Sequence, residues 1–161
     1  MRVAVVSDIH DNIWNLDKAL KLVADAAVLL CCGDICSPFT LKMLAEGFPG
    51  PVHVVFGNND GDVSLMHTVA ERLSNITFHK PIAQLELDGR RIAVAHYPEL
   101  GEALALCGKY DAVFSGHNHT ADVTRLGNTL WANPGEVMGR FGKPSLGIYD
   151  TETGEFTLRL I

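Results

Sequence analysis

Polar residues gather in this chain at the points where apolar runs end. One such run, Val3 to Ser7, leads directly into Asp8 and His10. Continuous apolar runs are typical of strands buried on both faces, which restricts the chain to folds with a covered sheet. The five polar clusters are Asp8-Ile9-His10, Gly33-Asp34, Gly57-Asn58-Asn59-Asp60, His96 and Gly116-His117-Asn118-His119. Because ligands bind beyond the carboxyl ends of strands in α/β sheets, the clusters predict one shared site.

The first half of the chain alternates between strand and helix patterns, and the second half is richer in strands. Strands are predicted over 3–7, 27–32, 52–56, 82–87, 91–95, 112–115, 121–126, 129–132, 146–150 and 155–160. Helices are predicted over 13–23, 40–46, 63–73 and 100–107. Turn signals such as Asp88-Gly89 separate the later strands. This order predicts an α/β fold of four layers, an αββα sandwich of two mixed β-sheets flanked by helices.

Length, charge and cysteine usage narrow the class of protein. The length fits one domain over residues 1–161, and a hydrophobic fraction of 47% is enough for a core. A formal charge of −6 argues against binding of nucleic acid duplexes, which usually requires a basic face. The cysteines show no disulfide framework: Cys31, Cys32, Cys36 and Cys107. With no signal-peptide pattern and no apolar stretch that could span a bilayer, we expect a cytoplasmic protein without membrane contact.

The polar clusters contain the donor atoms that divalent metals bind. Asp8 and His10 are two residues apart, so an extended chain would point both side chains to one face. The histidine pair in Gly116-His117-Asn118-His119 has the same spacing. Asp34 offers two carboxylate oxygens, and Asn58 offers a neutral amide oxygen. Imidazole, carboxylate and amide without thiolate suit Mn²⁺, Fe²⁺, Zn²⁺ or Ni²⁺ rather than a structural zinc site rich in cysteine.

Each cluster taken alone also has a purely structural interpretation. Asp8 or Asp34 could cap a following helix, and Asn58-Asn59-Asp60-Gly61 could be an ordinary turn. A lone His96 is more often a partly buried histidine than a ligand. The paired histidines of the last cluster are the hardest to explain in this way. All the structural interpretations would have to hold together, which favours a metal site.

The order Asp-x-His, Gly-Asp, Gly-Asn-x-Asp, His and Gly-His-x-His resembles that of the calcineurin-like metallophosphoesterases. The sequence is most similar to the small single-domain bacterial and archaeal phosphodiesterases, from residue 8 to Asn133-Pro134-Gly135. The resemblance implies that one metal ion is held by Asp8, His10, Asp34 and His119. It implies that the second is held by Asp34, Asn58, His96 and His117. Of these ligands, Asp34, Asn58 and His96 are the predicted catalytic residues.

The resemblance implies a metal-dependent phosphoric ester hydrolase that acts on small phosphodiesters. The nucleophile would be a hydroxide that bridges two divalent ions, with Mn²⁺ the first choice and Ni, Fe or Zn as alternatives. Such a protein needs only a small phosphoester substrate as partner, although self-association into a dimer or tetramer is plausible. The alternative is a non-catalytic protein-interaction scaffold of the same fold, as in a eukaryotic retromer subunit. The presence of all seven ligands favours catalysis.

Three positions depart from the family pattern. Asn59 stands where many members have a histidine that protonates the leaving group, which predicts a preference for leaving groups that depart easily. Tyr97 replaces a glycine after the motif histidine, and it either narrows the pocket or packs over the rim of the site. Glu136 follows Gly135 where relatives commonly have serine, and Arg140 further along either contacts the substrate phosphate or is solvated.

Overall fold

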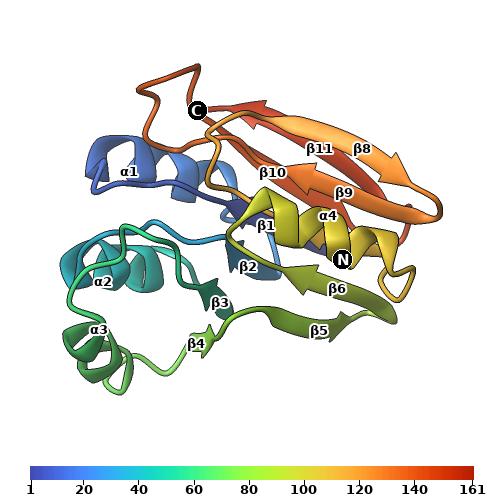
Figure 1. Ribbon diagram of the computed structural model, residues 1–161. Helices are drawn as coiled ribbons and strands as arrows, with labels where there is room; N and C mark the ends of the chain where they lie inside the picture. The colour runs from blue at the N-terminus through green and yellow to red at the C-terminus, as the bar shows by residue number, and fades with distance from the viewer.

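Two mixed sheets lie face to face in the computed structural model, which describes residues 1–161 (Figure 1). The first sheet has the order β11-β10-β1-β2-β3-β4 and the second the order β5-β6-β7-β9-β8. The strands of the first sheet are β1 (Arg2–Val6), β2 (Val28–Cys31), β3 (Val52–Val55), β4 (Ile76–His79), β10 (Ser145–Asp150) and β11 (Glu155–Leu160). Those of the second are β5 (Ala83–Leu87), β6 (Arg90–Val94), β7 (Ala112–Phe114), β8 (Asp122–Leu126) and β9 (Thr129–Asn133).

Helices cover the outer face of each sheet. Three of them, α1 (Ile13–Leu22), α2 (Pro38–Gly47) and α3 (Val63–Ala70), lie on the first sheet, and α4 (Pro98–Leu106) lies on the second. The predicted αββα arrangement of four layers is therefore confirmed. None of the four helices combines the length and apolar character needed to cross a membrane.

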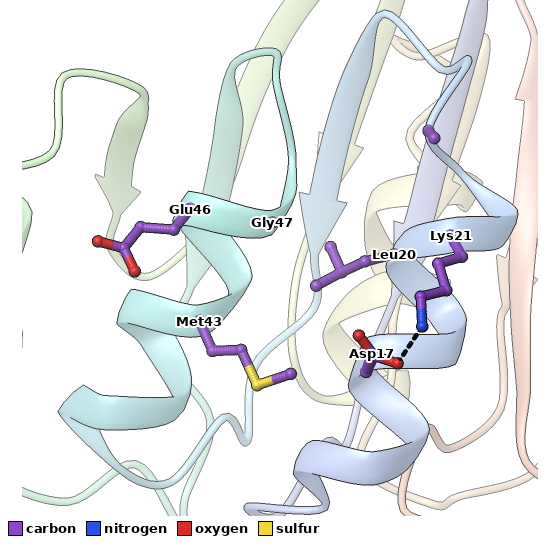
Figure 2. A pocket seen from close by; sticks show the side chains of 7 residues that line it. Asp17, Leu20, Lys21, Met43, Glu46 and Gly47 are labelled. Atoms are coloured by element: carbon purple, nitrogen blue, oxygen red, sulfur yellow. Dashed lines mark hydrogen bonds and ion pairs between the residues drawn. The ribbon is translucent and has the colours of Figure 1, made fainter.

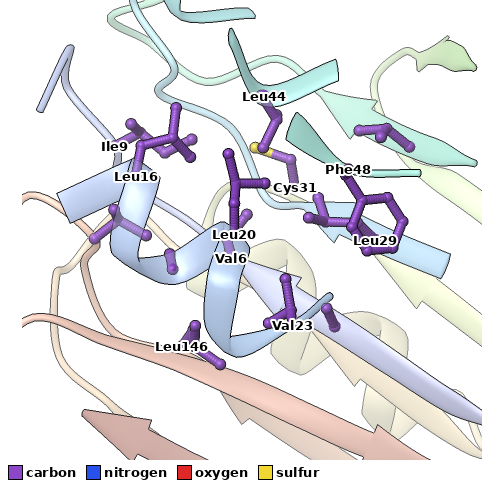
Figure 3. Packing of buried hydrophobic residues seen from close by; sticks show 14 of the residues in the cluster. Val6, Ile9, Leu16, Leu20, Val23, Leu29, Cys31, Leu44, Phe48 and Leu146 are labelled. Carbon is purple, nitrogen blue, oxygen red and sulfur yellow. The ribbon is translucent and has the colours of Figure 1, made fainter. Parts of the chain in front are cut away.

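The alternation of side chains along buried strands builds two cores. On β1, Ala4 and Val6 pack toward the helices, whereas Val3 and Val5 pack between the two sheets. The outer core also contains leucines from α1 and α2 (Figure 3). Each fully buried Leu or Val contributes roughly 1.5–3 kcal/mol relative to the exposed side chain. The strands beneath the site are thus held firmly on both faces.

Parallel strands bring the polar clusters to one edge of the molecule. Strands β1 to β4 run parallel in the first sheet, and β6, β7 and β9 run parallel in the second. In the first sheet Val6 pairs with Cys31, and Cys31 pairs with Val54. In the second, Val94 pairs with Phe114. Each predicted cluster therefore begins in a loop that leaves the same edge, two residues beyond the end of a strand.

One strand was missed by the sequence analysis. Strand β4 lies where a loop was expected, and α3 ends at Ala70 rather than at residue 73. The local pattern is weak because Ile76–His79 is short and flanked by Asn75 and Lys80. A long-range contact fixes it instead: the Asn75 amide donates to the carbonyls of Ala45, Phe48 and Gly50. Such contacts leave no periodic signal in the sequence.

A shallow hollow separates α1 from α2 on the outer surface (Figure 2). Gly47 allows the two helices to approach, because a Cβ there would lie 2.5 Å from Leu20 Cδ1. Asp17 and Lys21 form an ion pair of 2.5 Å on the rim, but both side chains are exposed, so the pair contributes little. The hollow contains none of the predicted ligands.

Candidate metal centre

One group of predicted ligands surrounds the Asp8 carboxylate. The Oδ1 atom of Asp8 lies 3.8 Å from His10 Nε2 and 3.7 Å from His119 Nε2. His10 Nε2 is also 3.4 Å from Asp34 Oδ2. The rings of His10 and His119 are stacked with their centroids 5.1 Å apart. Four donors from three loops therefore face one small volume.

A second group lies on the other side of Asp34. Its Oδ1 atom is 3.6 Å from His96 Nε2, which is 3.0 Å from Asn58 Oδ1. His117 Nδ1 completes the group at 2.9 Å from Asn58 Oδ1. Two ligand atoms bound about 2.1 Å from one ion lie roughly 3.0–3.4 Å apart. These separations are therefore close to those of ligands that share an ion, and Asp34 turns one oxygen toward each group.

Two buried polar atoms in this arrangement have no hydrogen-bond partner. They are Asp8 Oδ1 and His10 Nε2. An unsatisfied buried polar group costs about 1–3 kcal/mol, and more when it is charged. The cost is greatest for the carboxylates, since Asp8 and Asp34 are 0% and 1% exposed. A divalent cation satisfies such atoms, and the mixture of imidazole and carboxylate donors fits transition metals.

The far side of two histidine rings is fixed by a second contact. His119 Nδ1 lies 2.9 Å from Glu136 Oε2, and His96 Nδ1 donates to the Cys32 carbonyl at 2.7 Å. Both contacts leave the Nε2 lone pair directed at the centre, as metal-binding histidines require. The other oxygen of Glu136 accepts from the backbone N–H groups of Phe141 and Gly142 at 2.6 and 2.7 Å. The buried Glu136 thus joins a ligand to the loop between β9 and β10.

Charges within the centre shift the pKa of several groups. The Asp8 carboxylate raises the pKa of His10 to about 10. Burial acts to raise the pKa of Asp8, but the neighbouring His10 and Ser7 side chains and the charge of His119 outweigh it and lower the pKa. Burial is likewise outweighed at Glu136, where His119 and backbone N–H groups lower the pKa of the carboxyl. The carboxyl groups of Asp8 and Glu136 are therefore ionised at neutral pH.

Backbone turns, not an extended chain, direct the ligands inward. Five predicted ligands have positive φ: Asp8 (53°), His10 (45°), Asp34 (56°), His117 (72°) and His119 (60°). The expectation that Asp8 and His10 lie on extended chain was therefore wrong, although both side chains do reach the same place. Positive φ costs of order 1–3 kcal/mol for such residues and concentrates at functional sites. The strain persists here because neighbouring contacts hold the loops.

Asp60 makes many of the contacts that hold these loops in place. Its carboxylate accepts backbone N–H groups from Asp34, Ile35, Cys36 and Gly57 at 2.7–3.1 Å. The loops after β2 and β3 are thereby tied to each other. Sequence analysis placed Asp60 inside a motif but gave it no role. Its backbone partners Asp34, Ile35 and Cys36 lie 24 to 26 positions earlier in the chain, so only the folded loops show this function.

Asn59 forms hydrogen bonds with the carboxylate of Asp34. Its backbone N–H donates to Asp34 Oδ1 and its side-chain Nδ2 donates to Asp34 Oδ2, both at 2.8 Å. The amide therefore positions the predicted shared carboxylate. Asn12 caps α1 by accepting the Asn15 N–H, as expected, and Asp11 accepts hydrogen bonds at the start of α2. Neither belongs to the ligand groups.

Glu136 was missed as a functional residue. It was noted only as a departure from the family pattern, and its partner His119 lies 17 positions earlier in the chain. Arg140 does not reach the ligands, since its guanidinium lies over the Phe141 ring at 5.7 Å from the centroid. Tyr97 packs at the rim against His96 and His117, with ring centroids 5.0 and 4.9 Å apart.

The fold and this centre together define a phosphoesterase. The chain belongs to the calcineurin-like phosphoesterase superfamily, whose domain profile matches residues 1–154. The family predicted from the motif order is thereby confirmed, and with it the class of phosphoric ester hydrolases.

Individual relatives agree with this class. A phosphodiesterase from Methanocaldococcus jannaschii is 29% identical, covering 97% of this chain and 96% of that protein. A solved structure described as a novel archaeal phosphodiesterase matches with a TM-score of 0.92 at 27% identity, with 100% of both chains covered. Vps29 from Chaetomium thermophilum matches with a TM-score of 0.71 at 17% identity, covering 100% of this chain and 96% of that one. The likeness to Vps29 concerns the fold alone.

Proposed function

We propose that this protein is a phosphodiesterase that hydrolyses small phosphodiesters with two divalent metal ions, within one domain over residues 1–161. The two unpartnered buried atoms, Asp8 Oδ1 and His10 Nε2, carry the proposal, because they face the other candidate ligands and no protein group satisfies them. The archaeal relative named a phosphodiesterase supports the same substrate class. The first ion would be held by Asp8, His10, Asp34 and His119. The second would be held by Asp34, Asn58, His96 and His117.

The residues of the chain hold the centre rather than attack the substrate. When bound, the two cations would neutralise phosphate charge and lower the pKa of a water molecule between them. Ser7 and Ser115 are fully buried, so neither hydroxyl can serve as a nucleophile toward a ligand in solution. Glu136 and the Cys32 carbonyl keep His119 and His96 in the required orientation. Water is then the nucleophile that the site supports.

Asn59 limits which leaving groups depart. A neutral amide cannot donate a proton as an acid, and both of its donor groups are already directed at Asp34. We therefore propose a preference for diesters with weakly basic leaving groups, such as aryl esters. The variant Asn59→His should improve hydrolysis of alkyl diesters relative to aryl diesters. Equal rates for the variant and the wild type on alkyl diesters would contradict this preference.

Manganese is the metal we propose first, with nickel, iron or zinc as alternatives. Four of the seven ligands are imidazoles, which transition metals accept more readily than magnesium or calcium does. We further propose the cytoplasm as the compartment, a preference supported by four cysteines that are all free thiols. Self-association into a dimer or tetramer remains part of the proposal, because β11 and β8 are edge strands. The acidic net charge supports a small substrate rather than a nucleic acid duplex.

The alternative function, a non-catalytic scaffold, is compatible with the fold but does not require a complete set of metal ligands. A binding protein gains nothing from burying two carboxylates side by side at this centre, because burying a charge is costly unless it is paired. The assay that separates the two uses an aryl phosphodiester with each metal in turn, and then with excess chelator. Turnover that requires a divalent metal supports the proposal. Absence of turnover with every metal would leave the scaffold function.

A further inference from the structure

Two separate pockets flank the candidate metal centre. One, of about 250 Å³, is lined by His96 and Tyr97 together with Phe56 and Leu100. The other, of about 380 Å³, is lined by His119. The two pockets have no lining residue in common, and each contains ligands of only one end of the centre. Together their volumes fall within the roughly 300–1,000 Å³ that is typical of a site for one small molecule.

An exposed aromatic ring stands in each pocket. Tyr97 is 43% exposed and meets the rings of His96 and His117 at steep angles of 76° and 63°. Phe141 is 71% exposed and meets the His119 ring at 82°, with centroids 5.0 Å apart. Each ring is thus in contact with a ligand and still open to solvent. An exposed ring beside a polar centre is suited to covering a flat group of a bound molecule.

Hydrogen bonds fix the backbone that carries each ring. Tyr97 precedes the first turn of α4, whose Gly101 N–H donates to the Tyr97 carbonyl at 3.0 Å. Phe141 lies in the loop that Glu136 fixes through the Phe141 N–H. A contact made by a preorganised side chain loses less conformational entropy on binding. The fixed backbone and the contacts with the histidine rings together place both aromatic rings beside the centre.

The arrangement of elements places these surfaces on opposite sides of the centre. The loop between β9 and β10 carries Phe141, and it lies above the edge of the first sheet in Figure 1. The connection from β4 to β5 borders the Tyr97 pocket, and it lies below that edge. A phosphate at the centre would therefore have one pocket on either side. A monoester fills one of them at most, whereas a diester has a substituent for each.

We propose that the substrate is a phosphodiester with a flat ring system on both arms, one against Tyr97 and the other against Phe141. This inference rests on the phosphodiesterase function proposed above and adds the substrate class. Each pocket also has one lysine, Lys80 or Lys143, so anionic groups on either ring meet a counter-charge. Both lysines are exposed and contribute little, so the rings provide most of the discrimination.

Binding of phosphinates tests the inference without turnover, because their P–C bonds are not hydrolysed. Diphenylphosphinate has a ring on each arm, and dimethylphosphinate has none. With the Mn²⁺-loaded protein, Tyr97→Ala and Phe141→Ala should each weaken diphenylphosphinate binding about tenfold in calorimetry. Neither variant should change dimethylphosphinate binding. Tyr97→Phe and Phe141→Tyr retain the rings and should keep the wild-type affinity.

A matched control uses Phe39, which is 77% exposed and lines neither pocket. Phe39→Ala should bind both phosphinates as the wild type does. The inference is overturned if either alanine variant at the pockets binds diphenylphosphinate normally, or weakens both phosphinates equally. It is also overturned if Phe141→Ala changes only the oligomeric state in sedimentation, since Phe141 would then serve a second copy of the chain.

A hydrolysis assay distinguishes failure of the two-ring substrate inference from failure of the proposed phosphodiesterase function. Wild-type protein is assayed with bis(p-nitrophenyl) phosphate and with methyl p-nitrophenyl phosphate. If neither ester is hydrolysed with any divalent metal, the phosphodiesterase proposal itself fails, and the substrate inference fails with it. If both are hydrolysed but the alanine variants do not discriminate between the phosphinates, only the two-ring substrate is wrong.

Discussion

At the scale of single residues, the centre depends on partners that lie behind its ligands. Glu136 links His119 to a loop, Asn59 supports Asp34, and Asp60 ties two loops together. That the candidate ligands lie close together could be predicted, because their residue types are chemically distinctive and follow strands. Their supporting partners could not, because glutamate or asparagine in a loop has many structural roles. Only spatial proximity shows what such a residue supports.

Removal of the Glu136 charge tests whether this residue supports metal binding through His119. Glu136→Gln should weaken metal binding by about 10- to 100-fold, because the carboxylate fixes the orientation of the His119 ring. Calorimetric titration with Mn²⁺ measures the change. Glu155→Gln, an exposed residue on β11, is the control and should bind as the wild type does. An affinity equal to wild type for Glu136→Gln would show that the contact is incidental.

Gly57 tests how closely the backbone must approach the shared carboxylate. A Cβ at this position would lie 2.1 Å from Asp34 Oδ1, so Gly57→Ala must displace the side chain. We expect at least a tenfold loss of metal affinity and a lower free energy of unfolding. Gly61→Ala is the matched control in the same loop, since its Cβ would meet nothing nearer than 3.7 Å. Equal metal titration curves for both variants would contradict the geometry.

At the scale of elements, the edge strand β4 is the element for which the prediction from local sequence differs from the structure. The buried strands of the first sheet could be predicted because continuous apolar runs are rare elsewhere. Strand β4 has half-buried residues, and it is held by pairing with β3 and by Asn75. The positive φ values of Asp8 and His10 could not be predicted either, because most Asp and His residues have negative φ even though both types are enriched in the left-handed region. Contacts between elements determine both features.

The pairing of β3 with β4 predicts a dependence of stability on pH. His53 Nδ1 and His79 Nε2 are 3.0 Å apart, and burial lowers the pKa of both below the usual 6.5. The unfolded chain then binds more protons than the folded chain as the pH falls below 6.5. The stability that the neutral pair provides is present above pH 6.5 and is lost as the pH falls through that value toward the folded pKa. His79→Gln should lose less stability than wild type between pH 7 and pH 5.

Urea denaturation at the two pH values, with chelator present throughout, measures that difference. The decrease in the free energy of unfolding should be smaller for His79→Gln than for the wild type. The same decrease in both proteins would show that this pair does not titrate on unfolding.

At the scale of the whole molecule, the centre joins the two sheets. The first sheet contributes Asp8, His10, Asp34 and Asn58, and the second contributes His96, His117 and His119. The site therefore exists only when both sheets pack face to face. Because the unfolded chain has no such site, a metal that binds the folded state must stabilise it. The fold and the function are thus linked through the same loops.

That linkage predicts a measurable stabilisation. At a free Mn²⁺ concentration 100 times the Kd, one bound ion adds about 2.7 kcal/mol to the free energy of unfolding. Urea denaturation with Mn²⁺ and with chelator should show this difference for the wild type and a smaller one for Asp34→Asn. If the wild-type transition is the same under both conditions, the folded protein does not bind the metal preferentially.

The most direct test of the account is the number of metal ions bound per chain, measured together with phosphodiester hydrolysis. Elemental analysis of the reconstituted wild type should find two equivalents of Mn²⁺, and bis(p-nitrophenyl) phosphate should be hydrolysed. Asp34→Asn should retain fewer ions and lose most of the activity, since one carboxylate faces both ligand groups. No stoichiometric uptake by the wild type, or undiminished hydrolysis by Asp34→Asn, would contradict a centre of two metals that share Asp34.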